Sequence, residues 1–512
     1  MAQERQLRER VASGVAWNIA EKVGSTLLQI IVSIVVANRI MPIDMGIIAV
    51  LSVFISLAQV VIDSGFSQTL IRKENPTEGD FKAVFRFNLI ASIGLYLLLV
   101  TLSPYLAEYY DWLPLGTLQV IAPVLILLLP LNALCVIQNT IMVREFRFAE
   151  LSTIIFLSSL ISGLLAIALA LMGFGIWSIV AQRVGMIASK AVLLWWKSPW
   201  RPRRDIKCES LREMAPYSLR LIATDMITSL YNNIAQLFIG IRYSGDMLGY
   251  FNQAQKLKDT PVNATMQSIQ SVTFPALSKI QSDAQKFDDS YRRVVMVTAF
   301  VMLPVMAGLI ATAQDFYTLL LKPEWHPAIP YFRILCLIGI FYPIAAISYN
   351  VLKVRSNGKV ILRLEIIKKV AMTLMLVITI PMSVKAIAWG MVLMAALEFI
   401  LNFVATRAFT GLRTRSFIRT LLPICTLTAV MYASVMFFGV YFAGLSAGVM
   451  LFIKIIIGVA VYTLGAMVSG MEAWGEIMTI AKGLIGRKKE KKRTNFKKSV
   501  PLIYQNPLEE LK

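Results

Sequence analysis

The chain consists largely of apolar segments long enough to cross a lipid bilayer, and this feature limits its fold more than any other. Crossing roughly 30 Å of hydrocarbon takes about 20 residues of helix, and the backbone polar groups at that depth must be hydrogen-bonded internally. With 57% hydrophobic residues, the sequence predicts an all-α integral membrane protein and excludes a soluble multidomain enzyme. The fourteen predicted spans are 12–36, 45–70, 83–103, 117–142, 152–172, 175–196, 215–240, 250–275, 294–314, 329–352, 364–381, 386–406, 417–440 and 447–470.

Two stretches 203 residues apart carry the same polar pattern through otherwise apolar spans. In each, polar residues recur three or four positions apart and form one stripe along a helix. Polar residues facing lipid are costly, so two repeat-related stripes indicate two bundles that enclose an aqueous cavity, as in transporters. The first stripe contains Asn18, Glu21, Lys22, Ser25, Gln29 and Ser33; the second contains Thr224, Asp225, Thr228, Asn232 and Gln236.

The repeat also predicts the domain organisation. Arg39 and Gly46 match Arg242 and Gly249 at the same offset, and Arg144 matches Arg355 at an offset of 211. Each unit then holds six spans, and an even number gives both copies the same orientation in the membrane. The predicted parts are an N-lobe (1–205), a C-lobe (206–408), an added helical hairpin (409–470) and a basic tail (471–512).

The distribution of Lys and Arg predicts the topology. Eight alternate segments hold 39 of the 51 basic residues, whereas the loops on the other side hold four. By the positive-inside rule, the basic segments and both termini are cytoplasmic. The formal charge of +21 is spread over these segments without a nucleic-acid-binding motif, so attraction to membrane lipids explains it and no nucleic acid partner is expected.

The second and eighth spans add two further polar stripes, although hydropathy alone would miss the eighth. Such residues either join helices by hydrogen bonds or line the cavity, and the symmetric pattern on four helices favours a cavity. The stripes are Ser52, Ser56, Gln59, Asp63 and Ser67 on one span, and Asp259, Asn263, Gln267 and Gln270 on the other.

Charged residues within the spans are the strongest candidates for function. Lys22 and Asp225 occupy equivalent repeat positions with opposite sign, so they form either a fixed ion pair or a pair that a substrate or ion separates. The candidate substrate-binding residues are Lys22, Arg220, Lys256, Arg333, Gln29, Asn232 and Asn263. The candidate coupling or ion-pair residues are Glu21, Asp63 and Asp225, with Na⁺ or H⁺ as the coupling ion.

No signature of an enzyme or a cofactor is found in the sequence. His326 stands alone, which does not favour a metal site, and no phosphate-binding loop, dinucleotide fingerprint or catalytic triad spacing is present. The longest outer loop has about 15 residues, which argues against a membrane glycosyltransferase or polymerase.

Several segments in order carry a family resemblance: VIDSGFSQTLIRK (61–73), FKAVFRFN (81–88), GFGIWSIVAQ (173–182), LGYFNQAQKLKDTPVN (248–263) and FPALSKIQSD (274–283). The chain resembles bacterial polysaccharide flippases of the Wzx type, in the colanic-acid and teichuronic-acid exporter branch of the superfamily that includes MATE exporters. Gln253 replaces an Arg that is frequent in that family, and Lys256 stands one turn further on.

The resemblance implies a fourteen-helix, two-lobed protein of the bacterial inner membrane. Its expected activity is to move an undecaprenyl-pyrophosphate-linked oligosaccharide to the outer leaflet by alternating access, next to polysaccharide assembly machinery. The predicted basic residues would then neutralise the pyrophosphate. The alternative is a MATE-like cation or drug exporter with an acidic cavity, for which Asp63, Asp225 and Glu398 are available.

The topology can be tested with reporter fusions. Fusions after residues 110 and 245 should report outside and fusions after 205 and 490 inside, because the basic segments stay in the cytoplasm. An inside signal at 245 would contradict the repeat.

Overall fold

The computed structural model describes residues 24–63, 65–73, 76–202, 211, 214–280, 283–356, 358–411, 414–442 and 444–479. Within these ranges the regular structure is helical, and ten helices are long and apolar enough to cross a membrane. The predicted all-α membrane fold is therefore confirmed, whereas the number of fourteen spans stays a prediction. The predicted spans outside these ten are the short helix Gly24–Ala37 and the more polar helices α9, α10 and α14.

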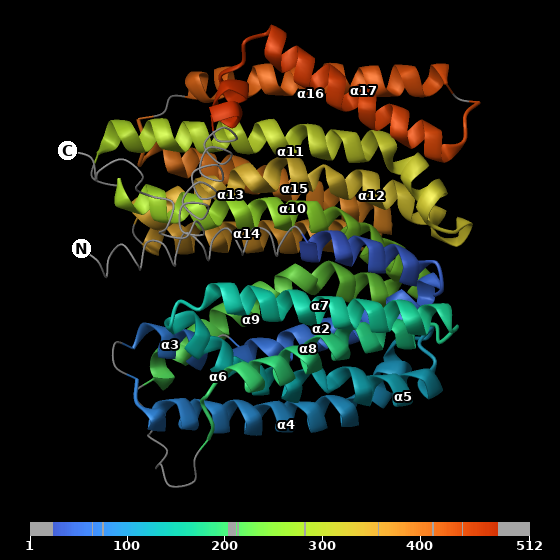
Figure 1. Ribbon diagram of the computed structural model, residues 1–512, viewed down its shortest axis with the longest axis vertical. Coiled ribbons are helices and arrows are strands. Elements are labelled where there is room, and N and C mark those ends of the chain that lie inside the picture. The colour runs from blue at the N-terminus through green and yellow to red at the C-terminus, as the bar shows by residue number, and fades with distance from the viewer. Residues whose placement is uncertain are drawn as a thin grey trace, which may run out of the picture.

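The first half of the chain forms one helical bundle, the lower group in Figure 1. Its helices after Gly24–Ala37 are α2 (Pro42–Asp63), α3 (Phe66–Arg72), α4 (Glu78–Tyr109), α5 (Leu115–Ile126), α6 (Leu128–Arg144), α7 (Phe148–Leu171) and α8 (Trp177–Lys197). Local sequence sets some of these boundaries. At the start of α4, the Thr77 side chain accepts from the Asp80 backbone and Asp80 accepts from the Thr77 backbone, a reciprocal cap.

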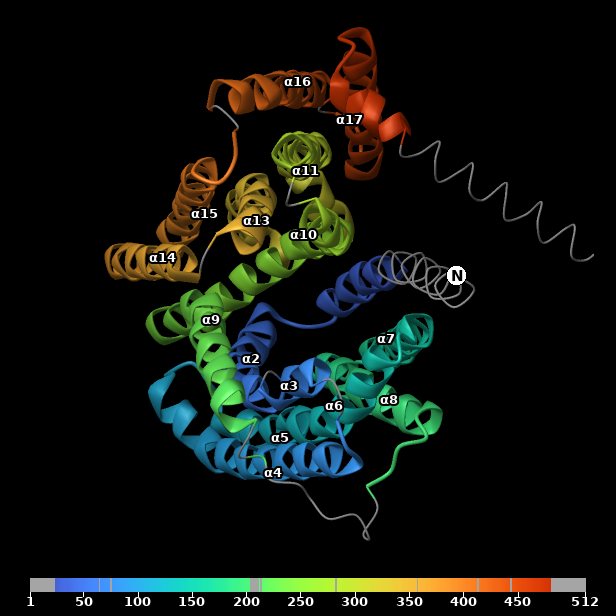
Figure 2. The ribbon, with the colours of Figure 1, turned by 90° about the vertical axis from the view of Figure 1, so that its left-hand side faces the viewer.

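The second half begins with α9 (Ala215–Arg242), which lies between the two bundles in Figure 2. The upper bundle contains α10 (Gly245–Lys279), α11 (Ala284–Leu320), the 3₁₀ helix η1 (Pro323–Ala328), α12 (Ile329–Cys336), α13 (Ile338–Arg355), α14 (Gly358–Thr379) and α15 (Val384–Arg407). The hairpin of α16 (Thr414–Tyr441) and α17 (Ala447–Val468) covers its outer side.

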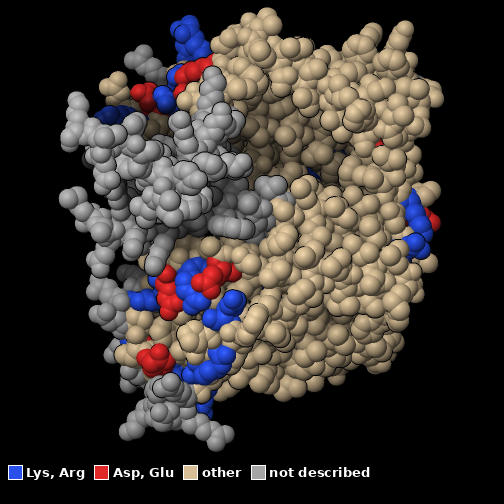
Figure 3. Space-filling model, viewed as in Figure 1, with Lys and Arg blue, Asp and Glu red and all other residues tan. Residues whose placement is uncertain are grey.

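The helix ends fall into two groups. The end that carries the turns at 145–147, 198–202 and 408–411 is called the basic end, and the end with the turns at 38–41, 110–114 and 321–328 the opposite end. On the face shown in Figure 3 the charged side chains gather at these ends, and the surface between them carries few charged side chains. This is the surface expected of a multi-pass membrane protein.

Two helix breaks agree with the sequence repeat. Leu127 separates α5 from α6, and Leu337 separates α12 from α13, 210 residues further on. Both residues keep right-handed backbone angles, with ψ of −17° and −29°, so each break is a slight bend between two half-helices. The repeat therefore extends to irregular details of the backbone.

The hairpin is attached to α11 by apolar packing and by one ion pair. Phe300 of α11 contacts Tyr462 of α17, with ring centroids 4.9 Å apart. Closer to the opposite end, Lys454 Nζ lies 2.6 Å from Asp315 Oδ2, and the two side chains are only 11% and 13% exposed. Because neither charge reaches water easily, each is needed to compensate the other.

Replacing Lys454 by Met should lower the free energy of unfolding by about 3–5 kcal/mol, because the Asp315 carboxylate is left buried and unpaired. The double variant Lys454→Met with Asp315→Leu should regain most of this loss. Thermal unfolding in detergent measures both. Lys286→Met is the control, since its pair with Asp283 is exposed and contributes about 0–1 kcal/mol; equal melting of all variants would contradict the role of the buried pair.

Candidate functional site

Helix α9 joins the two bundles because it packs along α2 and α3. Near the basic end, the hydroxyl of Ser218 on α9 lies 2.8 Å from that of Thr69 on α3. Gly65, just before α3, lies against Ile222, since a Cβ at Gly65 would come within 2.7 Å of the Ile222 side chain. Midway along the helix, Asn233 donates to Ser56 Oγ of α2 at 3.2 Å. One side of the boundary between the bundles is thereby closed.

At the opposite end, α2 and α10 touch through their backbones. A Cβ on Gly46 would lie 2.3 Å from the carbonyl oxygen of Gly245, and a Cβ on Gly249 would lie 1.9 Å from that of Pro42. The contact is reciprocal, because the repeat offset of 203 relates Pro42 to Gly245 and Gly46 to Gly249. Only glycine permits so close an approach, so these two positions hold the bundles together around a pseudo-two-fold axis.

Side chains reinforce this closure of the opposite end. Trp112 Nε1 donates to the carbonyl of Gly240 at 2.9 Å, and Trp325 Nε1 donates to that of Ala37 at 2.8 Å. Asn38 donates to the Leu320 carbonyl at 2.6 Å and accepts from the Lys322 backbone at 2.8 Å. Each bond joins the first half of the chain to the second, so the described structure is sealed at this end.

A polar cluster lies directly beneath the seal, where α2, α8, α9 and α10 meet. Arg183 of α8 donates to the hydroxyl of Ser52, and the Lys256 ammonium of α10 lies within electrostatic range of the Arg183 guanidinium. Gln236 donates to Gln255 at 3.1 Å. At about 1.5 Å per residue, Ser52 and Lys256 lie roughly 15 Å along their helices from the opposite end, near the middle of the membrane.

The two cations of this cluster, Arg183 and Lys256, differ from several other lysines of the described structure in lacking a carboxylate partner there. In the part of the chain that the structure describes, neither Arg183 nor Lys256 has a carboxylate within ion-pair distance. By contrast, Lys368 lies 2.6 Å from Glu365 and 3.3 Å from Glu398. Unpaired cations at membrane depth are costly, and an anionic ligand would compensate them. A guanidinium and an ammonium within electrostatic range of each other suit phosphate oxygens, with the planar fork of Arg binding two at once.

The structure brings only part of the predicted substrate-binding set to this cluster. Lys256 belongs to it, and Asn232 is exposed on α9 beside Asn233. Gln29 is exposed on the first described helix, and Asn263 is exposed on α10 two turns from Lys256. Lys22 lies outside the described residues.

Two predicted cations lie elsewhere. Arg220 is exposed on α9, near the basic end of the molecule. Arg333 is exposed on α12, near the opposite end of the molecule. Their helices place them toward opposite ends of the molecule, so they do not converge on Lys256. A spacing of three or four residues shows that side chains share a helix face. It does not show how deep each side chain lies in the membrane or which residue it contacts.

The predicted acidic residues are also dispersed. Asp63, at the end of α2, accepts from Asn132 of α6 at 2.6 Å. Asp225 is half-buried on α9, and Glu21 lies outside the described residues. Lys22 is also outside them, so the predicted pair of Lys22 with Asp225 is not described. Their coupling role stays a prediction.

Arg183 is the functional candidate that sequence reasoning missed. A signal for it exists, because it is the single Arg of α8, seven residues into this span, and charged residues within spans are usually functional. Gln253, the position where related sequences frequently have Arg, is fully buried in α10, three residues before the half-buried Lys256. Lys256 is thus the basic residue that this segment brings to the cluster.

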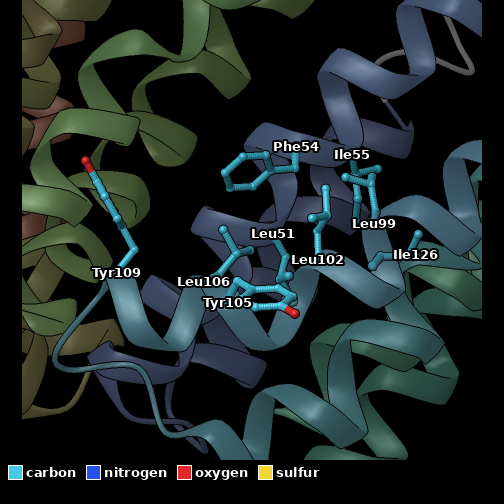
Figure 4. Close-up of a pocket in the computed structure, with 9 residues that line it drawn as sticks. All are labelled: Leu51, Phe54, Ile55, Leu99, Leu102, Tyr105, Leu106, Tyr109 and Ile126. Carbon is cyan, nitrogen blue, oxygen red and sulfur yellow. The ribbon is translucent and has the colours of Figure 1, made fainter.

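A separate apolar hollow lies on another face of α2 (Figure 4). It measures about 240 Å³ and lies between α2, α4 and α5. Its lining residues are Leu51, Phe54, Ile55, Leu99, Leu102, Tyr105, Leu106, Tyr109 and Ile126. Because charged and amide side chains are absent from this lining, the hollow is suited to hydrocarbon and is distinct from the polar cluster.

Comparison with known proteins agrees with this architecture. Residues 35–330 match the family described as polysaccharide biosynthesis protein, and the chain belongs to this family. It is 23% identical to the teichuronic acid biosynthesis protein TuaB of Bacillus subtilis over 65% of this chain and 69% of TuaB. It is 23% identical to the succinoglycan biosynthesis transport protein ExoT of Rhizobium meliloti over 71% of this chain and 73% of ExoT.

The fold is shared with a solved flippase. The structure of the lipid II flippase MurJ in an inward closed conformation superimposes with a TM-score of 0.68 over 88% of this chain and 97% of MurJ, at 15% identity. At this identity the likeness concerns the fold alone. Together with the family match, it confirms the resemblance found in the sequence.

The glycine contact predicts how the seal can be opened. Gly249→Ala forces a methyl group against the Pro42 carbonyl, a clash of about 1–3 kcal/mol that should favour separated bundles by roughly 5- to 150-fold. A cysteine at the buried position Val50 should then react faster with a thiol reagent added from the opposite side. Gly308→Ala is the control, because its added Cβ meets open space; equal labelling in both variants would show that the contact is not a seal.

Proposed function

We propose that this protein is a flippase that moves a polyprenyl-pyrophosphate-linked oligosaccharide across the bacterial inner membrane by alternating access. The observation that carries the proposal is the Arg183–Lys256 pair, two cations at mid-membrane depth with no carboxylate partner among the described residues. The pyrophosphate, which joins the lipid to the sugars, would supply the missing negative charge.

The shape of the molecule supports a substrate that is partly lipid. Figure 3 shows a hollow between the two bundles that opens sideways through the apolar flank. The side that carries α9 is closed by contacts with α2 and α3. A lateral opening lets a polyprenyl chain stay in the bilayer while the charged group reaches the cluster, so hydrocarbon never has to cross water.

The closed opposite end supports alternating access. The Gly46–Gly249 contact and the bonds of Trp112 and Trp325 seal the opposite end. In the second conformation these contacts would break, and the α3–α9 contacts near the basic end would take part in closing the other side. The substrate would thus be exposed to one side at a time.

Relatives named for teichuronic acid biosynthesis and succinoglycan transport support a role in polysaccharide export rather than catalysis. Within this proposal, undecaprenyl pyrophosphate is the lipid carrier and polysaccharide assembly machinery receives the product. The basic end and both termini face the cytoplasm, as the distribution of Lys and Arg predicts.

The alternative of a cation or drug exporter would need carboxylates free to bind a cation. Glu398 already faces Lys368, and Asp63 lies at the basic end of α2, away from the cation cluster. The cluster at the interface is instead cationic, which favours an anionic ligand. If transport is coupled to Na⁺ or H⁺, Asp63 and Asp225 are the described carboxylates proposed to bind the ion.

Binding measurements test the anion site. Arg183→Gln and Lys256→Gln should each weaken binding of polyprenyl pyrophosphate to the purified protein in nanodiscs by about 1.5–3 kcal/mol, roughly ten- to a hundredfold. Export of surface polysaccharide should fall at normal protein level. Arg242→Gln, which removes an exposed cation at the far end of α9, should leave both unchanged; wild-type binding and export by both site variants would refute the mechanism.

A further inference from the structure

The surface of α9 is divided into three strips with different surroundings. One strip packs against α2 and α3 through residues such as Ser218 and Asn233. A second strip is exposed and apolar, with Leu219, Ile227 and Leu230 exposed by 59%, 53% and 37%. The third strip, at four-residue spacing, is exposed and polar and contains Thr224, Thr228 and Asn232. Since lipid accounts for the apolar strip, the polar strip faces the aqueous space between the bundles.

The polar strip of α9 begins one residue from Asn233, which contacts α2, and runs towards the basic end. Asn232 lies next to Asn233, which contacts Ser56 of α2, and Thr228 and Thr224 follow one turn apart. Helix α10 shows the same arrangement independently. Its exposed Asn263 lies two turns from Lys256 on the same face, again in the direction of the basic end.

The hydroxyl groups of this strip are arranged as acceptors. Thr224 Oγ1 donates to the Arg220 carbonyl at 2.9 Å, and Thr228 Oγ1 donates to the Thr224 carbonyl at 2.9 Å. Their donor hydrogens are therefore used within the helix, and their lone pairs point outward. Asn232 and Asn263 can both donate and accept. Uncharged acceptors and amides in a row match the hydroxyl groups of a sugar chain and offer little to a pyrophosphate.

We propose that Thr224, Thr228 and Asn232 of α9, with Asn263 of α10, form a glycan subsite that holds the sugars of the substrate between the cation cluster and the basic end. This inference rests on the proposed function and adds an orientation to it. The pyrophosphate binds at Arg183 and Lys256, deep under the seal, and the oligosaccharide extends from there towards the basic end. The subsite selects for a sugar-bearing lipid over the bare carrier.

The test compares two ligands on the protein in nanodiscs. One is polyprenyl pyrophosphate without sugars, and the other is the polyprenyl-pyrophosphate-linked oligosaccharide extracted from the source cells and defined by mass spectrometry. The wild type should bind the sugar-bearing ligand more tightly. Thr224→Val with Thr228→Val keeps the side-chain shape but removes both hydroxyls, and should weaken binding of that ligand by about tenfold while leaving the bare pyrophosphate unaffected.

Control variants separate the possible outcomes. Thr426→Val makes the same change at an exposed threonine of α16, whose hydroxyl also donates to a helix carbonyl, and should alter neither affinity. Asn263→Leu, on the other helix, should reproduce the selective loss. An unchanged ratio of the two affinities in the α9 and α10 variants would overturn the glycan subsite. Failure of Arg183→Gln to weaken either ligand would overturn the proposed function instead.

Discussion

The close approach of α2 and α10 is the contact on which the rest of the arrangement depends. Gly46 and Gly249 allow each helix to pack directly on the backbone carbonyl of the other, and a single added methyl group would separate them. This contact brings α2 and α10 together, and with them Ser52 and Lys256 at a similar depth. It also closes the opposite end over the polar cluster, so the same contact shapes the site and limits access to it.

The described cations within the spans are of two kinds, those paired with a carboxylate and those without one. Lys454 and Lys368 are matched by carboxylates within 2.6 Å and belong to the framework. Arg183 and Lys256 lie near each other without such partners among the described residues. In a medium of low dielectric an uncompensated pair of cations is unfavourable until an anion arrives. The fold thus leaves a local excess of positive charge that an anionic ligand would offset.

Helix α9 connects the site to both bundles. It packs against α2 through Asn233 and against α3 through Ser218, and it contacts α14 through Tyr231, whose hydroxyl lies 2.9 Å from that of Thr373. Lys369 of α14 also lies 4.6 Å from the centre of the Tyr231 ring. A movement of one bundle relative to the other must therefore displace the polar strip that carries Thr224 and Thr228. Helix α9 therefore carries the residues proposed to bind the substrate and also contacts both bundles.

The membrane fold, the repeat and the polar helices could be predicted from the sequence, because hydropathy and helical periodicity are local properties of the chain. The sequence match of Gly46 with Gly249 lies on the pseudo-two-fold contact, whereas the substrate-binding role of Lys256, Asn232 and Asn263 stays a prediction. Which cations lie near one another depends on the packing of the helices and could not be predicted. This packing brought in Arg183, placed Arg220 and Arg333 towards opposite ends, and buried Gln253. Periodicity defines a face of each helix, but the depth, partner and surroundings of a side chain depend on how the helices cross.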